Sequence, residues 1–382
     1  MPRSLARDER SEFARNSQRL GFLLNRKNFN FLRKMGKPVI LQQYPYTYLR
    51  TIVMKKNLLT KSDYDKVLKM TPDEIGKYLE DFEYKKEVDE LAMEYKGVEL
   101  IERTLQLNLG NKFNKLLIMS PHDLKVVVTL YLKRYDIYNI KTIIRAKFSN
   151  MSMEDTKKYL SPISVEETAF FDKLIAQKTV EDVFSSLGFL KEKDLRSALE
   201  HFKTSNSLVY IENTLDKFYF NFVFSQLRYL SMEGKVYKRF LLNEIDVLNV
   251  KLLLRLKEEN IPEQNIKDLI FTVGTIKKDT IDKMMKSDIP GIIKELEETD
   301  FKEVVENYGK ESGKISFTDL EMDLDRFLLQ QSKKLIRQHP MSVDVILGYM
   351  FLKDIEVKNL TRIIKAKQLG MEESFIEKTI VI

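Results

Sequence analysis

Isolated histidines and a complete lack of cysteine limit the chemistry that this chain could perform. Histidine metal sites need a second His three to five residues away, and His122, His201 and His339 each lack one. Without Cys there is no thiolate nucleophile, no Cys-ligated zinc and no disulfide, which suits a reducing, cytoplasmic setting. We therefore expect no catalytic residue, no metal ligand and no bound cofactor.

The segment from Gly309 to Ser316 comes nearest to a phosphate-binding loop. Such a loop has four residues between its glycines and a Ser or Thr directly after its Lys. Here three residues separate Gly309 from Gly313, and Ile315 occupies the hydroxyl position after Lys314. The segment is therefore expected to be a linker between helices.

Neighbouring carboxylates are the remaining candidates for acid–base catalysis. These pairs lie beside lysines in polar stretches: Glu258 with Glu259, Glu297 with Glu298, and Glu372 with Glu373. Solvated helix faces explain such pairs without a catalytic role. A hydrolase acting through one of them is therefore the least supported function.

Helices are the elements that would position any functional side chain. Charged residues make up 32% of the chain, whereas Gly and Pro number only 13 and 9 in 382 residues. This composition favours helices with solvated faces over sheets, and the aromatic segment Phe218–Phe224 is also predicted to be helical. Helix starts are predicted where a capping Ser or Thr precedes Pro or an acid, at Thr71, Ser120, Ser161, Thr179 and Ser287. The predicted fold class is all-α.

One sequence pattern occurs three times at a constant interval, beginning at Asp136, Asp246 and Glu356. It runs acid, β-branched residue, any residue, Asn, aliphatic, two variable positions, two aliphatics, base, any residue, Lys. Its polar positions are held by Asp136, Asn139, Arg145 and Lys147, then Asp246, Asn249, Arg255 and Lys257, then Glu356, Asn359, Lys365 and Lys367. We name these three stretches the signature segments.

A second set of positions repeats with nearly the same spacing. The predicted helix starts at Thr71, Thr179 and Ser287 are equally far apart in the chain. An acidic motif follows each start: Glu102-Arg-Thr-Leu105, Glu212-Asn-Thr-Leu215 and, one residue out of phase, Glu321-Met-Asp-Leu324. The two sets together predict three structural copies of similar size.

The repeats divide the chain into four predicted parts. Residues 1–40 form a basic leader, and three helical lobes follow at residues 41–150, 151–275 and 276–382. The terminal helices could be shared between lobes. Each lobe is long enough to have its own core.

The signature segments carry an apolar stripe, so one side of each is expected to pack inward. In the first segment Ile137, Ile140 and Ile143 recur at helical spacing. We expect Asp136 at the start of its helix, where the helix dipole favours an acid, and Asn139 beside a loop whose backbone groups it satisfies. A structural role is therefore predicted for the signature residues rather than contact with a ligand.

The net charge of +7 lies in the stretch 1–40, where ten basic residues face three acids. A basic amphipathic leader could touch phosphate or anionic lipid, or it could be a surface-packed helix. The rest of the chain balances its acids and bases, so no nucleic-acid partner is expected. The longest apolar run, Val345–Leu352, is far shorter than the ~20 residues that cross a bilayer.

The order and spacing of these motifs resemble the C subunit of archaeal A-type ATP synthases, which is related to the d subunit of the vacuolar proton pump. The resemblance runs from about residue 40 to the C-terminus. It is carried by the motif at Glu102, by the signature segments and by three further motifs: Tyr44-Pro45-Tyr46-Thr47-Tyr48-Leu49-Arg50, Leu58-Leu59-Thr60-Lys61-Ser62-Asp63-Tyr64 and Leu79-Glu80-Asp81-Phe82-Glu83-Tyr84. The basic leader has no counterpart in it.

This resemblance implies a funnel of three similar lobes around a pseudo-three-fold axis, without catalytic activity of its own. It implies a central-stalk adaptor that couples the rotating stalk to the membrane proteolipid ring for proton or sodium transport. Its partners would be that ring and the D and F subunits of the stalk, and it would be a peripheral protein on the cytoplasmic side of the cell membrane. The alternative function is a helical-repeat scaffold that binds proteins or nucleic acid through the basic leader.

Overall fold

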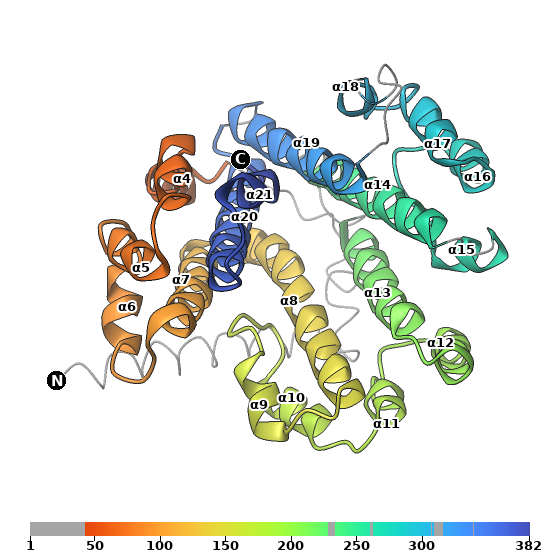
Figure 1. Cartoon of the computed structure of the whole chain (residues 1–382), viewed down its shortest axis with the longest axis horizontal. Helices are drawn as coiled ribbons and strands as arrows, with labels where there is room; N and C mark the ends of the chain where they lie inside the picture. The colour runs from red at the N-terminus through yellow and green to blue at the C-terminus, as the bar shows by residue number, and fades with distance from the viewer. Residues whose placement is uncertain (1–42, 228–233, 260–262, 307, 309–315, 339) are drawn as a thin grey trace. The chain divides into compact units, whose positions relative to one another are not determined.

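The structure, a computed structural model, describes residues 43–227, 234–259, 263–306, 308, 316–338 and 340–382. The basic leader predicted at residues 1–40 lies outside the described residues, as do residues 309–315 of the predicted linker. Every regular element in the described part of the chain is a helix (Figure 1). This confirms the predicted all-α class.

The chain divides into two units, and the second is built from two separate stretches of sequence. Of the described residues, 110–227 belong to the first unit, and 43–109 together with those from 234 to 382 belong to the second. Helix α7 (Gly97–Met119) runs from the second unit into the first. The other helices of the first unit are α8 (His122–Phe148), α9 (Met153–Lys158), α10 (Thr168–Ile175), α11 (Val180–Ser185), α12 (Glu192–Ser205) and α13 (Val209–Leu227).

The second unit holds the remaining helices. Before α7 these are α3 (Pro45–Lys56), α4 (Lys61–Val67), α5 (Pro72–Glu80) and α6 (Lys85–Leu91). After residue 233 they are α14 (Gly234–Glu258), α15 (Glu263–Leu269), α16 (Lys278–Lys286), α17 (Ile289–Leu296), α18 (Lys302–Val305), α19 (Phe317–Gln338), α20 (Val343–Gln368) and α21 (Glu373–Lys378).

In the first unit α8 is the central helix. It packs against α13, α10 and α11 (Figure 1). Fully buried aliphatic residues run along it, and Tyr131 meets Phe113 of α7 edge-to-face at 6.2 Å between ring centroids. Because partners cover it on several sides, α8 has the continuous apolar character of a buried helix. The predicted helix at Phe218–Phe224 lies within α13, which confirms that prediction.

In the second unit α20 has the corresponding central position. It packs against α19, α14, α3 and α5. Buried side chains of α19, of α20 and of the C-terminal residues form one apolar cluster: Met322, Leu329, Ile336, Val345, Leu352 and Val381. α20 is therefore buried on almost every side, and the hydroxyl of Ser342 caps its start by accepting from the Asp344 amide at 3.2 Å.

Two of the predicted helix starts show full capping boxes. The Thr71 hydroxyl accepts from the Glu74 amide, and the Glu74 carboxylate accepts from the Thr71 amide at 2.8 Å. Thr179 and Asp182 form the same reciprocal pair at the start of α11. These contacts satisfy amides that the first helical turn leaves unpaired.

Two other predicted starts are wrong. Ser287 ends α16, its hydroxyl donates to the Lys283 carbonyl at 2.9 Å, and Asp288 caps α17 instead. Ser161 lies in the loop before α10, because its backbone amide and carbonyl are bound by Asn139 and are not available for a helix.

The helices that carry the first and third signature segments end in the same way. Asn150 after α8 and Gly370 after α20 have positive φ angles of 55° and 70°. The next amides, Met151 and Met371, donate back to Ala146 and Ala366 at 2.8 and 2.9 Å. This six-to-one hydrogen bond closes the helix end, and it is identical in the two copies.

Candidate functional site

Each signature segment lies in the second half of a long helix: α8, α14 and α20. The prediction that Asp136 begins its helix is wrong, because the apolar pattern continues upstream and α8 begins at His122. Asp136, Asp246 and Glu356 are almost fully buried, with 0%, 0% and 3% exposed area. Since a buried carboxylate must be hydrogen-bonded, charge-paired or protonated, its surroundings in each copy define what it does.

The Asn position makes the same contact in all three copies. Asn139 donates to the Ser161 carbonyl at 3.2 Å and accepts from the Ser161 amide at 2.8 Å. Asn249 binds Phe271 at 3.0 and 2.9 Å, and Asn359 binds Val381 at 2.7 and 3.0 Å. In each case the partner lies 22 residues further on, so one amide side chain fixes one loop through both of its backbone groups.

In the first copy the buried Asp136 holds the loop before α10. Its Oδ1 accepts from the amides of Val165 and Glu166 at 2.9 and 3.3 Å and from the Ser164 hydroxyl at 2.9 Å. Lys133, one turn earlier on α8, lies 2.9 Å from the other carboxylate oxygen and also pairs with Glu166. Burial alone lowers the pKa of Lys133, but the charges of Asp136 and Glu166 outweigh it and raise that pKa.

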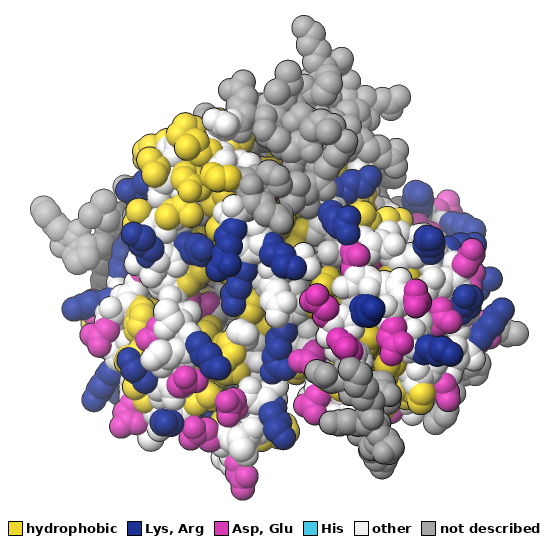
Figure 2. Space-filling view, turned by 90° about the horizontal axis from the view of Figure 1, so that it is seen from above, with side chains coloured by type: hydrophobic (Ala, Val, Ile, Leu, Met, Phe, Trp, Pro, Cys, Tyr) yellow, Lys and Arg dark blue, Asp and Glu magenta, His cyan; other side chains and the backbone are white. Residues whose placement is uncertain are grey.

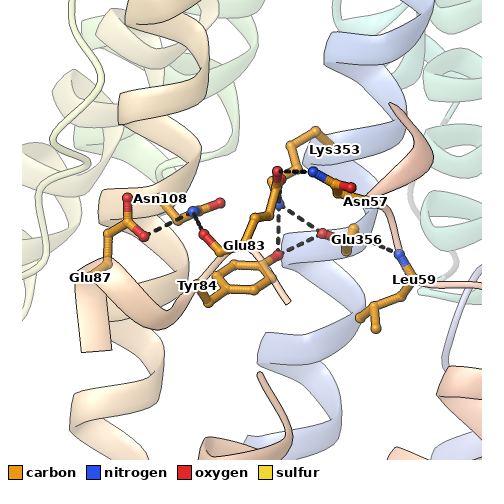
Figure 3. Close-up of polar contacts among 8 residues, drawn as sticks. All are labelled: Asn57, Leu59, Glu83, Tyr84, Glu87, Asn108, Lys353 and Glu356. Carbon is orange, nitrogen blue, oxygen red and sulfur yellow. Dashed lines mark hydrogen bonds and ion pairs between the residues drawn. The ribbon is translucent and has the colours of Figure 1, made fainter. Parts of the chain in front are cut away.

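In the third copy the buried acid belongs to a larger network within the second unit (Figure 3). Glu356 accepts from the Tyr84 hydroxyl at 2.6 Å, from the Leu59 amide at 2.6 Å and from Lys353 at 2.8 Å. Lys353 is fully buried and also donates to Glu83 at 3.0 Å and to the Tyr84 oxygen at 2.9 Å. The ammonium therefore uses all three of its donors.

Figure 3 also shows how this network is extended toward α6 and α7. Asn57 donates to Glu83 at 3.3 Å, while Asn108 of α7 donates to the Glu83 carbonyl at 2.9 Å and to Glu87 at 3.0 Å. Burial is the main cause that raises the pKa of Tyr84 well above its usual value, and the Glu356 charge adds to it. Tyr84 thus remains a neutral donor to Glu356.

The middle copy lacks the cation. Asp246 accepts from the Thr275 amide and hydroxyl at 2.5 and 2.6 Å and from the Ile276 amide at 3.2 Å. The residue one turn earlier is Asn243, where the other copies have Lys133 and Lys353. Burial is the main cause that raises the pKa of Asp246 to about 6, and the hydrogen bonds from Thr275 oppose it.

The middle loop also approaches its carboxylate unusually closely. A Cβ atom on Gly274 would lie 2.0 Å from Asp246 Oδ1 and 2.9 Å from its Cγ. Only glycine fits at this distance, so the loop backbone lies directly against the acid. Oδ1 has no hydrogen-bond partner within the described residues.

The basic signature positions join each copy to the acidic motif of another. The Arg145 guanidinium donates to both carboxylate oxygens of Glu212, at 2.7 and 2.6 Å. The Arg255 guanidinium donates to both carboxylate oxygens of Glu321 in the same way, at 2.6 and 2.8 Å. In the third copy Lys365 lies 3.2 Å from Glu102 of α7. The motif found out of phase at Glu321 therefore has the same partner position as its two counterparts.

The last signature position donates to a backbone carbonyl at the end of a short helix in two copies, α16 and α4. Lys257 donates to the Met285 carbonyl, and Lys367 donates to the Leu68 carbonyl at 2.5 Å. In the first copy Lys147 lies in the last turn of α8, where a cation is favoured by the helix dipole. Two further ion pairs, Lys141 with Asp216 at 2.5 Å and Lys251 with Asp325 at 2.6 Å, recur at equivalent positions.

The structure thus brings each acid and Asn of a signature to one loop, and each base to an acidic motif. Sequence reasoning missed Lys133 and Lys353, although extending the repeat by one helical turn upstream would have found them in the first and third copies, with Asn243 in the second. It assigned no contact to Glu83 and Tyr84, which have no repeated counterpart, although both end the motif at Leu79 that carries the resemblance.

This arrangement is suited to holding helices and loops together, because every carboxylate of the signatures is directed at backbone amides or cations of the chain itself. Within the described residues, no group of three or more His, Cys, Asp or Glu could hold a metal ion. His201 stacks on Tyr210 with ring centroids 3.8 Å apart, and His339 lies outside the described residues. No helix in the described part of the chain is long and apolar enough to cross a membrane.

The chain is similar to known proteins over most of its length. The family model of the ATP synthase (C/AC39) subunit matches residues 50–379. The chain is 33% identical to the C subunit of the A-type ATP synthase of Methanosarcina acetivorans over 342 residues, which cover 89% of this chain and 93% of that protein. It is 34% identical to the Methanosarcina mazei protein of the same name, with the same coverage, and 31% identical to that of Archaeoglobus fulgidus, covering 89% and 96%. These similarities do not favour the alternative of a nucleic-acid scaffold.

Proposed function

Because this chain belongs to the ATP synthase (C/AC39) subunit family, we propose that it is a non-catalytic central-stalk adaptor. In this role it couples the rotating stalk, including the D and F subunits, to the membrane proteolipid ring during proton or sodium transport. It lies as a peripheral protein on the cytoplasmic side of the cell membrane, held there by those partners. The names of its relatives carry only the subunit identity, so the coupling role is our inference.

The observation that carries the proposal is the contact set that occurs three times. Arg145 reaches Glu212 of the second copy, Arg255 reaches the third, and Lys365 of the third reaches Glu102 of the first. Helix α20, which carries the third signature segment, thus pairs with α7 of the first copy. Such a cyclic order of partners supports three lobes around a pseudo-three-fold axis, with the lobes at residues 41–150, 151–275 and 276–382.

A part that only transmits torque needs stiff connections between its elements. In the second unit Lys353, Glu356 and Tyr84 join α20 to the chain around α6 through hydrogen bonds of 2.6 to 2.9 Å, all out of contact with water. Buried charge-assisted bonds of this kind have short, fixed geometry. The signature residues would then act as fixed joints within the adaptor rather than as contacts to ring or stalk.

The test is an affinity purification of the tagged chain from detergent-solubilised membranes. The tag belongs at the N-terminus, because Val381 is 1% exposed and is bound by Asn359. We expect the proteolipid, the stalk subunits and ATP hydrolysis to co-purify. The matched control is the same bait carrying N359A, which removes the joint to the C-terminal residues and is expected to lower the yield of the complex.

A second measurement separates coupling from simple attachment. Membranes from a deletion strain should retain part of their ATP hydrolysis but lose ATP-driven ion uptake, and the full-length chain should restore uptake. Unchanged ion uptake without the chain would overturn the coupling role. A clean bait that brings down neither proteolipid nor stalk subunits would overturn the assignment of partners.

A further inference from the structure

Helix α3 buries two polar residues and exposes three apolar or aromatic ones. It turns Thr47 and Thr51 toward the core, whereas Tyr46, Leu49 and Val53 are 65%, 62% and 58% exposed. The three exposed side chains are spaced three and four residues apart, so they form one stripe along the helix. The buried Thr51 hydroxyl is satisfied by the Thr47 carbonyl at 2.7 Å. A surface helix normally buries its apolar residues, so this stripe is expected to contact something outside the fold.

The orientation of α3 is fixed by the rest of the second unit. The Tyr44 amide donates to the Met341 carbonyl at 2.8 Å, which ties the start of α3 to the chain between α19 and α20. Tyr48 and Ile52 pack against the apolar cluster of α19 and α20. The exposed stripe therefore cannot rotate into the core, and we name it, with the cations beside it, the α3 face.

Cations border this stripe. Arg50 and Lys56 are exposed on α3, and Lys333, Lys334 and Arg337 are exposed near the end of α19. Within the described residues none of these five side chains forms an ion pair. On the face of the molecule drawn in Figure 2, hydrophobic side chains gather in one region and Lys and Arg side chains border them.

Electrostatic coupling places the two sets of cations close together. The pKa of Lys55 at the end of α3 is lowered, first by partial burial and then by the charges of Arg337 and Lys333. From Arg326 to Val343 the sequence contains no Asp or Glu that could neutralise them. The α3 face is thus both apolar and uniformly cationic.

This charge limits which occupant can cover the face. The leader at residues 1–40 carries the whole excess charge of +7, so it would meet like charge. A second copy of the chain would bring an identical cationic face. An anionic surface is therefore favoured over both.

We propose that the α3 face binds an anionic lipid bilayer directly. Leu49 and Val53 lie at the boundary of headgroups and acyl chains, Tyr46 lies among the headgroups, and the bordering Lys and Arg side chains bind lipid phosphates. A helix with an apolar stripe, a tyrosine beside it and flanking cations is the pattern by which peripheral helices bind such surfaces. This goes beyond the proposed function, in which partner proteins hold the chain at the membrane, and it does not depend on that function.

The chain contains no Trp, so Y46W in the full-length protein supplies a single fluorophore on the α3 face. We expect its emission to shift to shorter wavelength with phosphatidylglycerol vesicles and to remain unchanged with phosphatidylcholine vesicles. The matched control is Y159W in the first unit, where Tyr159 is 61% exposed and no shift is expected. Equal spectra of Y46W with and without phosphatidylglycerol would overturn the proposal.

Cosedimentation with the same vesicles tests the two parts of the face separately from the leader. We expect K333E/R337E, and L49Q/V53Q in high salt, to bind at least tenfold more weakly than the wild type, with the leader intact in each. K193E/K203E on α12 makes the same charge change at exposed lysines and should bind as the wild type does. Unweakened binding by both α3-face variants would assign the lipid contact to the leader instead.

A further experiment distinguishes a protein partner from a lipid bilayer on the α3 face. If Y46W shifts only when proteolipid ring is added in detergent without vesicles, the face binds an acidic protein surface and the lipid proposal is overturned. Failure of the affinity purification described above would leave these vesicle measurements unaffected, so the two proposals can fail independently.

Discussion

Glu356 and Asp246 occupy the same position of the repeat, yet the chain neutralises them in different ways. Around Glu356 the buried Lys353 supplies a positive charge, and Tyr84 and the Leu59 amide supply hydrogen bonds. Within the described residues Asp246 receives bonds only from Thr275 and Ile276, and its pKa is raised to about 6. One site is therefore a charged network, while the other is a carboxyl group that burial drives toward its neutral form.

The difference shows that the three copies share the hydrogen bonds from the acid to backbone amides, but not the buried cation beside the acid. Both acids anchor a loop through backbone amides, which is the part of the contact common to all three copies. In the first and third copies the cation also pairs with a second carboxylate, Glu166 or Glu83, and in the middle copy Asn243 stands in the place of the cation. The copies should thus respond in opposite ways when charge is changed.

The largest effect is expected from removing the buried cation. K353M leaves Glu83 and Glu356 buried without their counterion, so we expect the free energy of unfolding to fall by about 3–5 kcal/mol. Urea unfolding monitored by circular dichroism measures this loss. The control K358M removes a lysine that is 54% exposed and pairs with Asp354, and it should change stability by less than about 1 kcal/mol.

A double-mutant cycle would measure how much of this loss comes from the Lys353–Glu356 pair. Since E356Q removes one of the two stranded charges, K353M/E356Q should be less destabilised than the sum of the single variants. If the losses simply add, the Lys353–Glu356 pair contributes no coupling and the contrast with Asp246 is lost.

The free energy of unfolding should depend on pH through Asp246 of the middle copy. Because the pKa of Asp246 is raised from 3.8 to about 6 by folding, the folded chain binds more protons than the unfolded chain between these values. Stability from this group is therefore present at low pH and declines as pH rises through that window, by at most about 3 kcal/mol. D246N cannot titrate, so the wild type should lose stability relative to D246N between pH 4 and 7.

Adding the missing cation would sharpen this test. N243K places a lysine one turn before Asp246, as Lys133 precedes Asp136, and should favour the charged carboxylate. We expect the decline between pH 4 and 7 to become smaller in N243K. Parallel stability curves for wild type and D246N over this range would show that Asp246 does not behave as a neutral buried acid.

The next effect is steric and depends on Gly274. A methyl group at this position would lie 2.0 Å from Asp246 Oδ1, so G274A should cost about 1–3 kcal/mol through overpacking. The control G188A has no heavy atom within 4 Å of the added carbon and should leave stability nearly unchanged. In a D246A background the cost of G274A should shrink, and an undiminished cost would place the strain elsewhere.

The helical class could be predicted from the sequence because it depends on local periodicity, and regular spacing marked the signature residues but not their partners in other copies. Ser161 and Ser287 were misassigned as helix starts since a side chain from another helix, Asn139, or a neighbouring Asp288 competed for the same backbone groups. The contact between Lys353 and Glu83 could not be predicted, because Glu83 lies 270 residues away in the chain and sequence spacing does not show which distant side chains meet.

The smallest effect is expected at the exposed joints, where the copies are alike. Arg255 binds Glu321 through two hydrogen bonds, but the Arg side chain is 63% exposed, so solvent screens the pair. R255A should therefore lower the free energy of unfolding by about 1 kcal/mol or less, and R145A, whose side chain is 55% exposed, should behave similarly. Urea unfolding at low and high salt measures both losses, which should shrink as salt increases. A loss in R255A as large as that in K353M would mean that the joint between copies, and not the buried network, dominates the stability of the second unit.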